Sequence, residues 1–171
     1  TIVFLYELSG QDEARVRQAA AGWTFVHGRS PDAWRAALSD AEIVVGWHKE
    51  AADAVLGTDS RVRWVQASSA GVDKLPLKAL QAKGIMLTTA SGVHPYPISE
   101  TVFAMMLAWT RKLHAYIRNQ QSARWDRAGL RLELHGKTIL IAGVGAIGRE
   151  VARLAKAFGM RVIGVRRSGG D

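Results

Sequence analysis

The sequence predicts an α/β protein built on parallel β-sheets, and three observations lead to this fold class. Short runs rich in β-branched and aromatic residues alternate with amphipathic stretches over residues 1–95, the pattern of strands joined by helical crossovers. A glycine-rich turn lies between a strand pattern and a helix pattern near the C-terminus. The composition, 48% hydrophobic and 22% charged, is that of a folded globular domain rather than a disordered chain.

The first domain is expected over residues 1–95. Ser30 followed by Pro31 is a typical helix start, because proline fits the first helical position. The expected strands are Ile2–Tyr6, Thr24–His27, Glu42–Gly46, Trp64–Ala67 and Ile85–Thr88. The expected helices lie around Glu13–Ala20, Asp32–Leu38, Ala51–Leu56 and Pro76–Ala82.

The second domain is expected over residues 96–171. It begins with one long inter-domain helix, from Ile98 to about Arg118, preceded by Pro95 and Pro97. Apolar residues spaced three and four apart predict the buried stripe of this helix; they are Val102, Met105, Met106, Trp109, Leu113 and Ile117. A strand, a helix and a second strand follow, at Thr138–Ala142, Ala146–Phe158 and Arg161–Val165. Because one such unit is a fraction of a dinucleotide-binding domain, we expect the sequence to be truncated.

Composition and charge exclude several classes of function. The sequence has no cysteine, which rules out disulfides, thiolate catalysis and cysteine-based metal sites and suits a cytoplasmic protein. It contains no long apolar run that would span a membrane, and its N-terminus lacks the features of a signal peptide. The net charge is +8, but the basic residues are scattered, so we expect no nucleic-acid partner.

The strongest motif is G-x-G-x-x-G, formed by Gly143, Gly145 and Gly148. The first glycine allows a tight turn, the second lets a pyrophosphate approach the backbone, and the third lets helix and strand pack closely. Ala146 and Ile147 complete the turn at the helix N-terminus, whose free N–H groups favour phosphate. The motif therefore predicts a dinucleotide site; the alternative is a structural turn in a fold that binds no nucleotide.

The end of the second strand predicts the cofactor. NAD-specific sites place an acidic residue there to bind the ribose 2′-hydroxyl, whereas this sequence has Arg166, Arg167 and Ser168. Two guanidinium groups and a hydroxyl favour a 2′-phosphate. We therefore expect NADP to be preferred over NAD; the alternative is that the arginines face solvent and either cofactor binds.

Three segments in order resemble the D-isomer-specific 2-hydroxyacid dehydrogenases. They are SSAGVDKL at residues 68–75, PISETVFAMMLAWTRK at residues 97–112, and the run from HGKTILIAGVGAIG to RVIGVRR at residues 135–167. The resemblance implies a flavodoxin-like substrate-binding domain, followed by the start of a Rossmann domain. It also implies hydride transfer between NAD(P)H and a small 2-oxo or 2-hydroxy acid, such as glyoxylate or hydroxypyruvate, in a homodimer.

The resemblance also implies substrate-binding residues. Backbone N–H groups of Ala70 and Gly71 would bind the substrate carboxylate, and Trp47 and His48 would line the substrate pocket. A simple turn and a structural histidine are the alternatives for these two pairs. The family's catalytic arginine, acidic residue and histidine correspond to no residue of this chain.

Two other functions remain open. One is a non-catalytic dinucleotide-sensing protein of the same fold, similar to the dehydrogenase-shaped corepressors, which would act through a partner surface. The other is a phosphoglycerate-type dehydrogenase, which Arg166 at the position of an NAD-specific acid disfavours.

Overall fold

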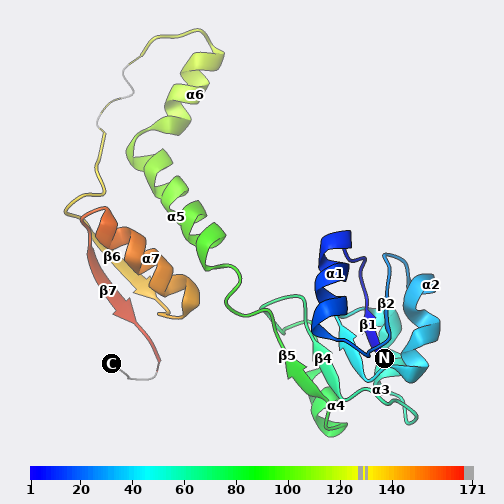
Figure 1. Cartoon of the computed structure of the whole chain (residues 1–171). Coiled ribbons are helices and arrows are strands. Elements are labelled where there is room, and N and C mark those ends of the chain that lie inside the picture. Colours follow the sequence, from blue (N-terminus) through cyan, green and yellow to red (C-terminus); the bar gives the residue numbers. More distant parts are fainter. Residues whose placement is uncertain (127–128, 130, 168–171) are drawn as a thin grey trace. The chain divides into compact units, whose positions relative to one another are not determined.

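The chain divides into two compact units, Thr1–Ser91 and Gly92–Asp171. The computed structural model describes residues 1–126, 129 and 131–167 (Figure 1). Within these described ranges, no helix is both long enough and apolar enough to cross a membrane.

The first unit is built on one parallel five-stranded sheet. Its strand order is β2-β1-β3-β4-β5, the doubly wound order of flavodoxin-like folds. In register, Val3 of β1 is paired with Val44 of β3, and Val44 with Val65 of β4. The strands are β1 (Ile2–Phe4), β2 (Phe25–His27), β3 (Ile43–Val45), β4 (Trp64–Gln66) and β5 (Met86–Thr88). The predicted fold class is confirmed, and all five expected strands are present with slightly shorter ends.

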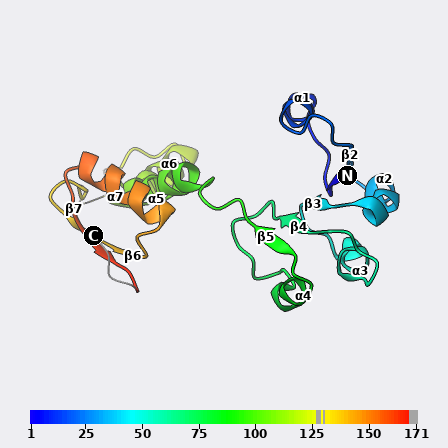
Figure 2. The same ribbon diagram turned by 60° about the horizontal axis from the view of Figure 1, so that its bottom comes forward.

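The helices of this unit cover the two faces of the sheet unequally. The α-helices are α1 (Gly10–Ala19), α2 (Pro31–Trp34), α3 (Ala52–Leu56) and α4 (Leu77–Ala82), and the 3₁₀ helices are η1 (Arg35–Asp40) and η2 (Lys49–Ala51). Figure 2 shows α1 on the opposite side of the sheet from α3 and α4. The main core lies on the α3 and α4 side, where Trp34, Leu38, Val55 and Leu80 pack with the valines of the sheet. Helix α1 is mostly polar and has no fully buried residue.

The second unit pairs two helices with a strand–helix–strand segment. It contains α5 (Pro95–Thr110), α6 (Leu113–Gln121), β6 (Thr138–Ala142), α7 (Ala146–Ala157) and β7 (Arg161–Val165). Strands β6 and β7 are parallel, with Ala142 paired to Val165. The prediction of one continuous helix from Ile98 to Arg118 was wrong: Lys112 has a φ of 59°, and this left-handed conformation separates α5 from α6.

The buried face of α5 also differs from the prediction. Phe103 is buried and packs with Leu134, Ile141, Val151 and Ala155, because α7 lies against this side of α5. Four residues of the predicted stripe are exposed instead, with exposed fractions of 61, 65, 51 and 47%; they are Met105, Trp109, Leu113 and Ile117. We call these four residues the exposed stripe.

Candidate cofactor and substrate sites

The glycine turn between β6 and α7 has the geometry that a close-approaching backbone requires. Gly143 has a φ of +101°, which L side chains rarely adopt, and its N–H donates to the Val165 carbonyl at 2.8 Å. A Cβ on Gly148 would lie 2.1 Å from the carbonyl oxygen of Gly143, so only glycine fits there. A Cβ on Gly145 would meet nothing within 4 Å, so the space beside Gly145 is open to a ligand.

Helix α7 begins at this turn with unsatisfied backbone donors. Gly145 is its N-cap and supplies no side-chain cap, and the Arg149 N–H donates the first helical hydrogen bond to the Gly145 carbonyl, at 2.9 Å. The N–H groups of the first turn, from Ala146 to Gly148, precede that bond and have no carbonyl partner within the helix. Together with the helix dipole they form a site suited to a phosphate group. The residues present therefore fit a dinucleotide pyrophosphate.

The end of β7 lies beside the glycine turn. Ala142 is paired with Val165, and Gly143 bonds to Val165, so Arg166 and Arg167 continue from the strand end next to the turn. Both arginines are exposed, and Arg166 interacts with another group of the protein. Ser168 lies outside the described residues. The two guanidinium groups add positive charge near the predicted phosphate site.

Sequence reasoning missed one glycine of this site. Gly164 of β7 faces the turn, and a Cβ there would lie 2.7 Å from Cγ2 of Val144. Its missing side chain lets Val144, the residue between Gly143 and Gly145, pack over β7. A glycine inside a strand is a recognised sign of such close approach, so the signal was present in the sequence.

The candidate substrate loop follows β4 in the first unit. Ala70 and Gly71 are both exposed. The loop is held by two bonds: Ser69 Oγ donates to the Gly71 carbonyl at 2.7 Å, and Ala90 N–H donates to the Ser69 carbonyl at 3.1 Å. A Cβ on Gly71 would make only an ordinary 3.5 Å contact with Asp73. An exposed, fixed loop with small residues suits an anion that approaches main-chain donors.

Trp47 and His48 follow β3 at the same edge of the sheet. Gly46 N–H donates to the Gln66 carbonyl at 2.8 Å, which keeps the ends of β3 and β4 side by side. Trp47 is half-buried against the core. His48 Nδ1 accepts the Glu50 N–H at 3.3 Å, and the imidazole packs edge-on to Trp34 with ring centroids 5.8 Å apart. One ring nitrogen of His48 is thus occupied by a structural bond, which leaves Nε2 for a ligand.

The two sets of predicted residues lie in different units. Trp47, His48, Ala70 and Gly71 belong to Thr1–Ser91, and the residues from Gly143 to Arg167 belong to Gly92–Asp171. Among the residues that the structure describes, no group of three or more histidine or acidic side chains is placed to hold a metal ion.

Comparisons with known proteins point to one family. Residues 103–171 match the model of the D-isomer specific 2-hydroxyacid dehydrogenase, NAD binding domain. The chain is 32% identical over 111 residues to a D-3-phosphoglycerate dehydrogenase of Methanocaldococcus jannaschii, an alignment that covers 64% of this chain and 21% of that protein. It is 29% identical over 125 residues to a hydroxypyruvate reductase of Thermotoga maritima, covering 72% of this chain and 40% of that protein.

Solved structures agree with this match. A D-isomer specific 2-hydroxyacid dehydrogenase family protein from Aeromonas salmonicida superimposes with a TM-score of 0.80 at 28% identity. The alignment covers 99% of this chain and 55% of that chain. The chain thus spans about half the length of the solved structures that it matches, and 21–40% of the two curated relatives.

Proposed function

We propose that the protein containing this chain is an oxidoreductase, because the chain belongs to the D-isomer-specific 2-hydroxyacid dehydrogenase family. The reaction is hydride transfer between NAD(P)H and a small 2-oxo or 2-hydroxy acid. The observation that carries this proposal is the glycine turn, where Gly148 admits no side chain and Gly145 faces open space at the start of α7. A bound nicotinamide cofactor would supply or accept the hydride.

Each proposed site residue has a chemical role. N–H groups of residues 143–148, including Ala146 and Ile147, bind the cofactor pyrophosphate at the N-terminus of α7. N–H groups of Ala70 and Gly71 bind the substrate carboxylate, Trp47 forms a wall of the pocket, and His48 Nε2 is available to a substrate oxygen. We assign the catalytic arginine, histidine and acidic residue of the family to no residue of this chain.

NADPH is the proposed cofactor because of the charge beside the glycine turn. Arg166 and Arg167 stand where an NAD-specific site needs an acid, and both are exposed. Guanidinium groups bind phosphate through charge-assisted hydrogen bonds. Ser168 would add a hydroxyl. Dissociation constants for NADPH and NADH, measured in the same buffer, test this proposal, and a smaller constant for NADH contradicts it.

A homodimer is proposed from the exposed stripe. Met105 and Trp109 lie one turn apart on α5, and Leu113 and Ile117 lie one turn apart on α6. All four are 47–65% exposed, and exposed apolar groups are typical of association surfaces. A second copy of the chain is the partner that family membership favours. Sedimentation velocity on the wild type and on Trp109→Glu tests this, and a wild-type monomer contradicts it.

We place the protein in the cytoplasm, since its lack of cysteine suits a reducing compartment.

The catalytic proposal is tested by NADPH oxidation. Glyoxylate and hydroxypyruvate are the proposed substrates, and the gene product that contains residues 1–171 is the protein to assay. Loss of NADPH absorbance that depends on either acid is the expected result. NADPH binding without turnover of these or other 2-oxo acids, in a protein that carries the family's catalytic histidine, contradicts catalysis and favours the dinucleotide-sensing alternative.

A further inference from the structure

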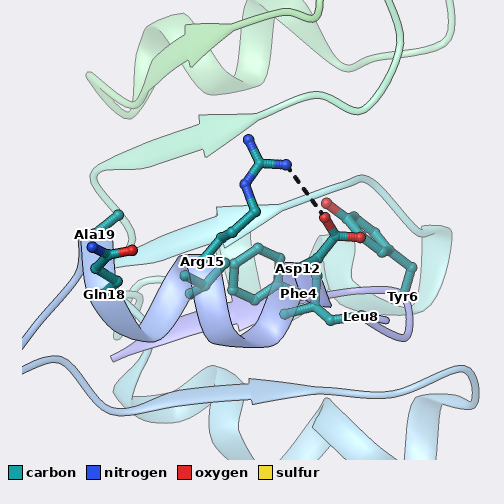
Figure 3. Close-up of a pocket in the computed structure, with 8 residues that line it drawn as sticks. Phe4, Tyr6, Leu8, Asp12, Arg15, Gln18 and Ala19 are labelled. Carbon is teal, nitrogen blue, oxygen red and sulfur yellow. Dashed lines mark ion pairs between the residues drawn. The ribbon is translucent and has the colours of Figure 1, made fainter. Parts of the chain in front are cut away.

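One row of paired residues crosses the sheet of the first unit near the carboxyl ends of its strands. In register, Phe4 of β1 is paired with Val45 of β3, Val45 with Gln66 of β4, and Gln66 with Thr88 of β5. Residues paired in this way point to the same face of a parallel sheet. Figure 3 shows the ring of Phe4 beside α1, so the row lies on the α1 side of the sheet, opposite the main core. Its polar end, at Gln66 and Thr88, lies directly before the candidate substrate loop.

Gln66 and Thr88 form a chain of side-chain hydrogen bonds with Trp64. The indole N–H of Trp64 donates to Oγ1 of Thr88 at 2.6 Å, and this hydroxyl donates to Oε1 of Gln66 at 2.6 Å. Because an indole N–H is a donor only, the hydroxyl accepts from Trp64 and gives its single proton to Gln66. Nε2 of Gln66 then donates to the Ala67 carbonyl at 2.8 Å. The three half-buried side chains thus hold the Gln66 amide in one orientation.

The last bond of this chain fixes the peptide group at which the candidate substrate loop begins. Ala67 is 2% exposed, and its N–H donates to the Thr88 carbonyl at 2.8 Å. Its carbonyl is held by Gln66. The peptide between Ala67 and Ser68 is trans, and in a planar trans peptide the carbonyl and the N–H point in opposite directions. The side chain of Gln66 therefore also sets the direction of the Ser68 N–H.

The loop beyond this peptide offers backbone N–H donors to a ligand. Ser68, Ala70 and Gly71 are all exposed. Over the described residues, the N–H groups of these three residues have no hydrogen-bond acceptor within the protein. Because all three follow Ala67 in the same short loop, a rotation of the Ala67 peptide would move them together. A displacement of about 1 Å in a binding group has a large effect on how a substrate is held.

We propose that Gln66 is a positioning residue for the substrate carboxylate. Its side-chain amide, oriented by Thr88 and Trp64, holds the Ala67 peptide so that the N–H groups of the substrate loop point toward the carboxylate. The identity of this ligand rests on the proposed function. The order of the loop, in contrast, can be measured without any ligand.

The first test compares two substitutions at Thr88 in the ¹⁵N-labelled gene product that contains residues 1–171. Thr88→Val removes the hydroxyl and keeps the branched shape, so it breaks the link from Trp64 to Gln66. Thr88→Ser is the matched control, because it keeps the hydroxyl. Order parameters from ¹⁵N relaxation should stay near the value of about 0.85 for rigid backbone at Ala70 and Gly71 in the wild type and the control. They should fall in Thr88→Val.

The second test is the steady-state reduction of glyoxylate by the same proteins. Thr88→Val should raise KM about fivefold, the contribution of one neutral hydrogen bond. Its kcat should stay within about twofold of the wild type, because the loop binds the carboxylate equally in the ground state and the transition state. Thr88→Ser should restore the wild-type KM to within about twofold. A purely structural role would not separate KM from kcat in this way.

Gln66→Met is the second variant, and it keeps the bond between Trp64 and Thr88 while removing the bond to Ala67. It should lower the order parameters of the loop and raise KM as Thr88→Val does, and thermal unfolding verifies that each variant is folded. The proposal is overturned if a folded Thr88→Val or Gln66→Met protein keeps the wild-type order parameters. It is also overturned if KM is unchanged, or if Thr88→Ser has the same effects as Thr88→Val.

The order parameters need no substrate, so they decide whether Gln66 positions the loop even if the protein reduces no 2-oxo acid. That absence of turnover would contradict the proposed function alone.

Discussion

Replacing Gly148 by alanine should destabilise the second unit. The new Cβ would lie 2.1 Å from the Gly143 carbonyl oxygen and 3.1 Å from Cγ2 of Ile141. Since a comfortable carbon–oxygen contact is about 3.3 Å, the backbone of the glycine turn must move by roughly 1 Å. Overpacking of this kind costs about 3 kcal/mol, at the upper end of its range because the clashing atom belongs to the backbone. The helix preference for alanine offsets about 1 kcal/mol.

The net expectation is a loss of about 2 kcal/mol in the free energy of unfolding. Urea denaturation followed by circular dichroism measures it, and NADPH binding should fall in the same variant because the turn is displaced. Gly145→Ala is the matched control: its Cβ meets nothing within 4 Å and its φ is −86°. This control should unfold within about 0.5 kcal/mol of the wild type.

The same control should nevertheless lose affinity for NADPH by about tenfold or more, since its methyl group occupies the space proposed for the pyrophosphate. The reasoning is refuted if Gly148→Ala is as stable as the wild type. It is equally refuted if Gly145→Ala binds NADPH with unchanged affinity.

Three further experiments test the cofactor preference, the buried face of α5 and the pKa of Tyr6. Replacing Arg166 and Arg167 together by aspartate should change the ratio of the NADPH and NADH dissociation constants by about tenfold or more, so that NADH becomes the preferred cofactor. An unchanged ratio contradicts the proposed role of these arginines. Phe103→Ala should cost about 3–5 kcal/mol, because Phe103 is 4% exposed and stacks on Phe158 at 5.0 Å. Glu100→Ala, at an exposed site of the same helix outside the exposed stripe, should cost less than about 0.5 kcal/mol, and equal melting temperatures for the two variants contradict the observed face of α5. Burial and the Asp12 carboxylate raise the pKa of Tyr6, so its neutral form stabilises the fold, and this contribution is lost as the pH rises above about 10. The free energy of unfolding measured across that range should therefore depend less on pH in Tyr6→Phe than in the wild type. Identical pH slopes for the two proteins contradict the raised pKa.

Periodicity predicted the strands of the first unit but not which face of α5 is buried. The strands contain short runs of β-branched and aromatic residues, and their middle residues Val3, Val44 and Val65 are fully buried, so the pattern that predicts them is local. Helix α5 is apolar on several sides. Only the position of α7 decides that Phe103, rather than Trp109, is buried.

The break between α5 and α6 was also beyond local sequence signals. It falls at Lys112, which adopts a left-handed conformation, and the neighbouring residues include no glycine or proline that would predict a helix end. The nearby contacts of Trp109, with Lys112 over its ring at 5.4 Å and His114 stacked at 5.5 Å, accompany the break.

In the candidate sites, too, local sequence spacing predicts some features, whereas others depend on contacts between different elements. The spacing of Gly143, Gly145 and Gly148 predicted distinct roles that depend on backbone geometry, and the φ of Gly143 and the close packing at Gly148 agree with these roles. The bond from Glu50 to His48 and the packing of His48 on Trp34 depend on side chains from different elements. Sequence spacing alone leaves the structural and ligand-binding interpretations of His48 equally open.

The central claim, that the turn from Gly143 to Gly148 binds a dinucleotide, is tested most directly by titrating NADPH into the ¹⁵N-labelled protein. The account predicts saturable shift changes that are largest at Gly143, Gly145 and Gly148, with smaller changes at Arg166 and Arg167. An absence of saturable changes, or changes concentrated outside these two segments, would contradict it.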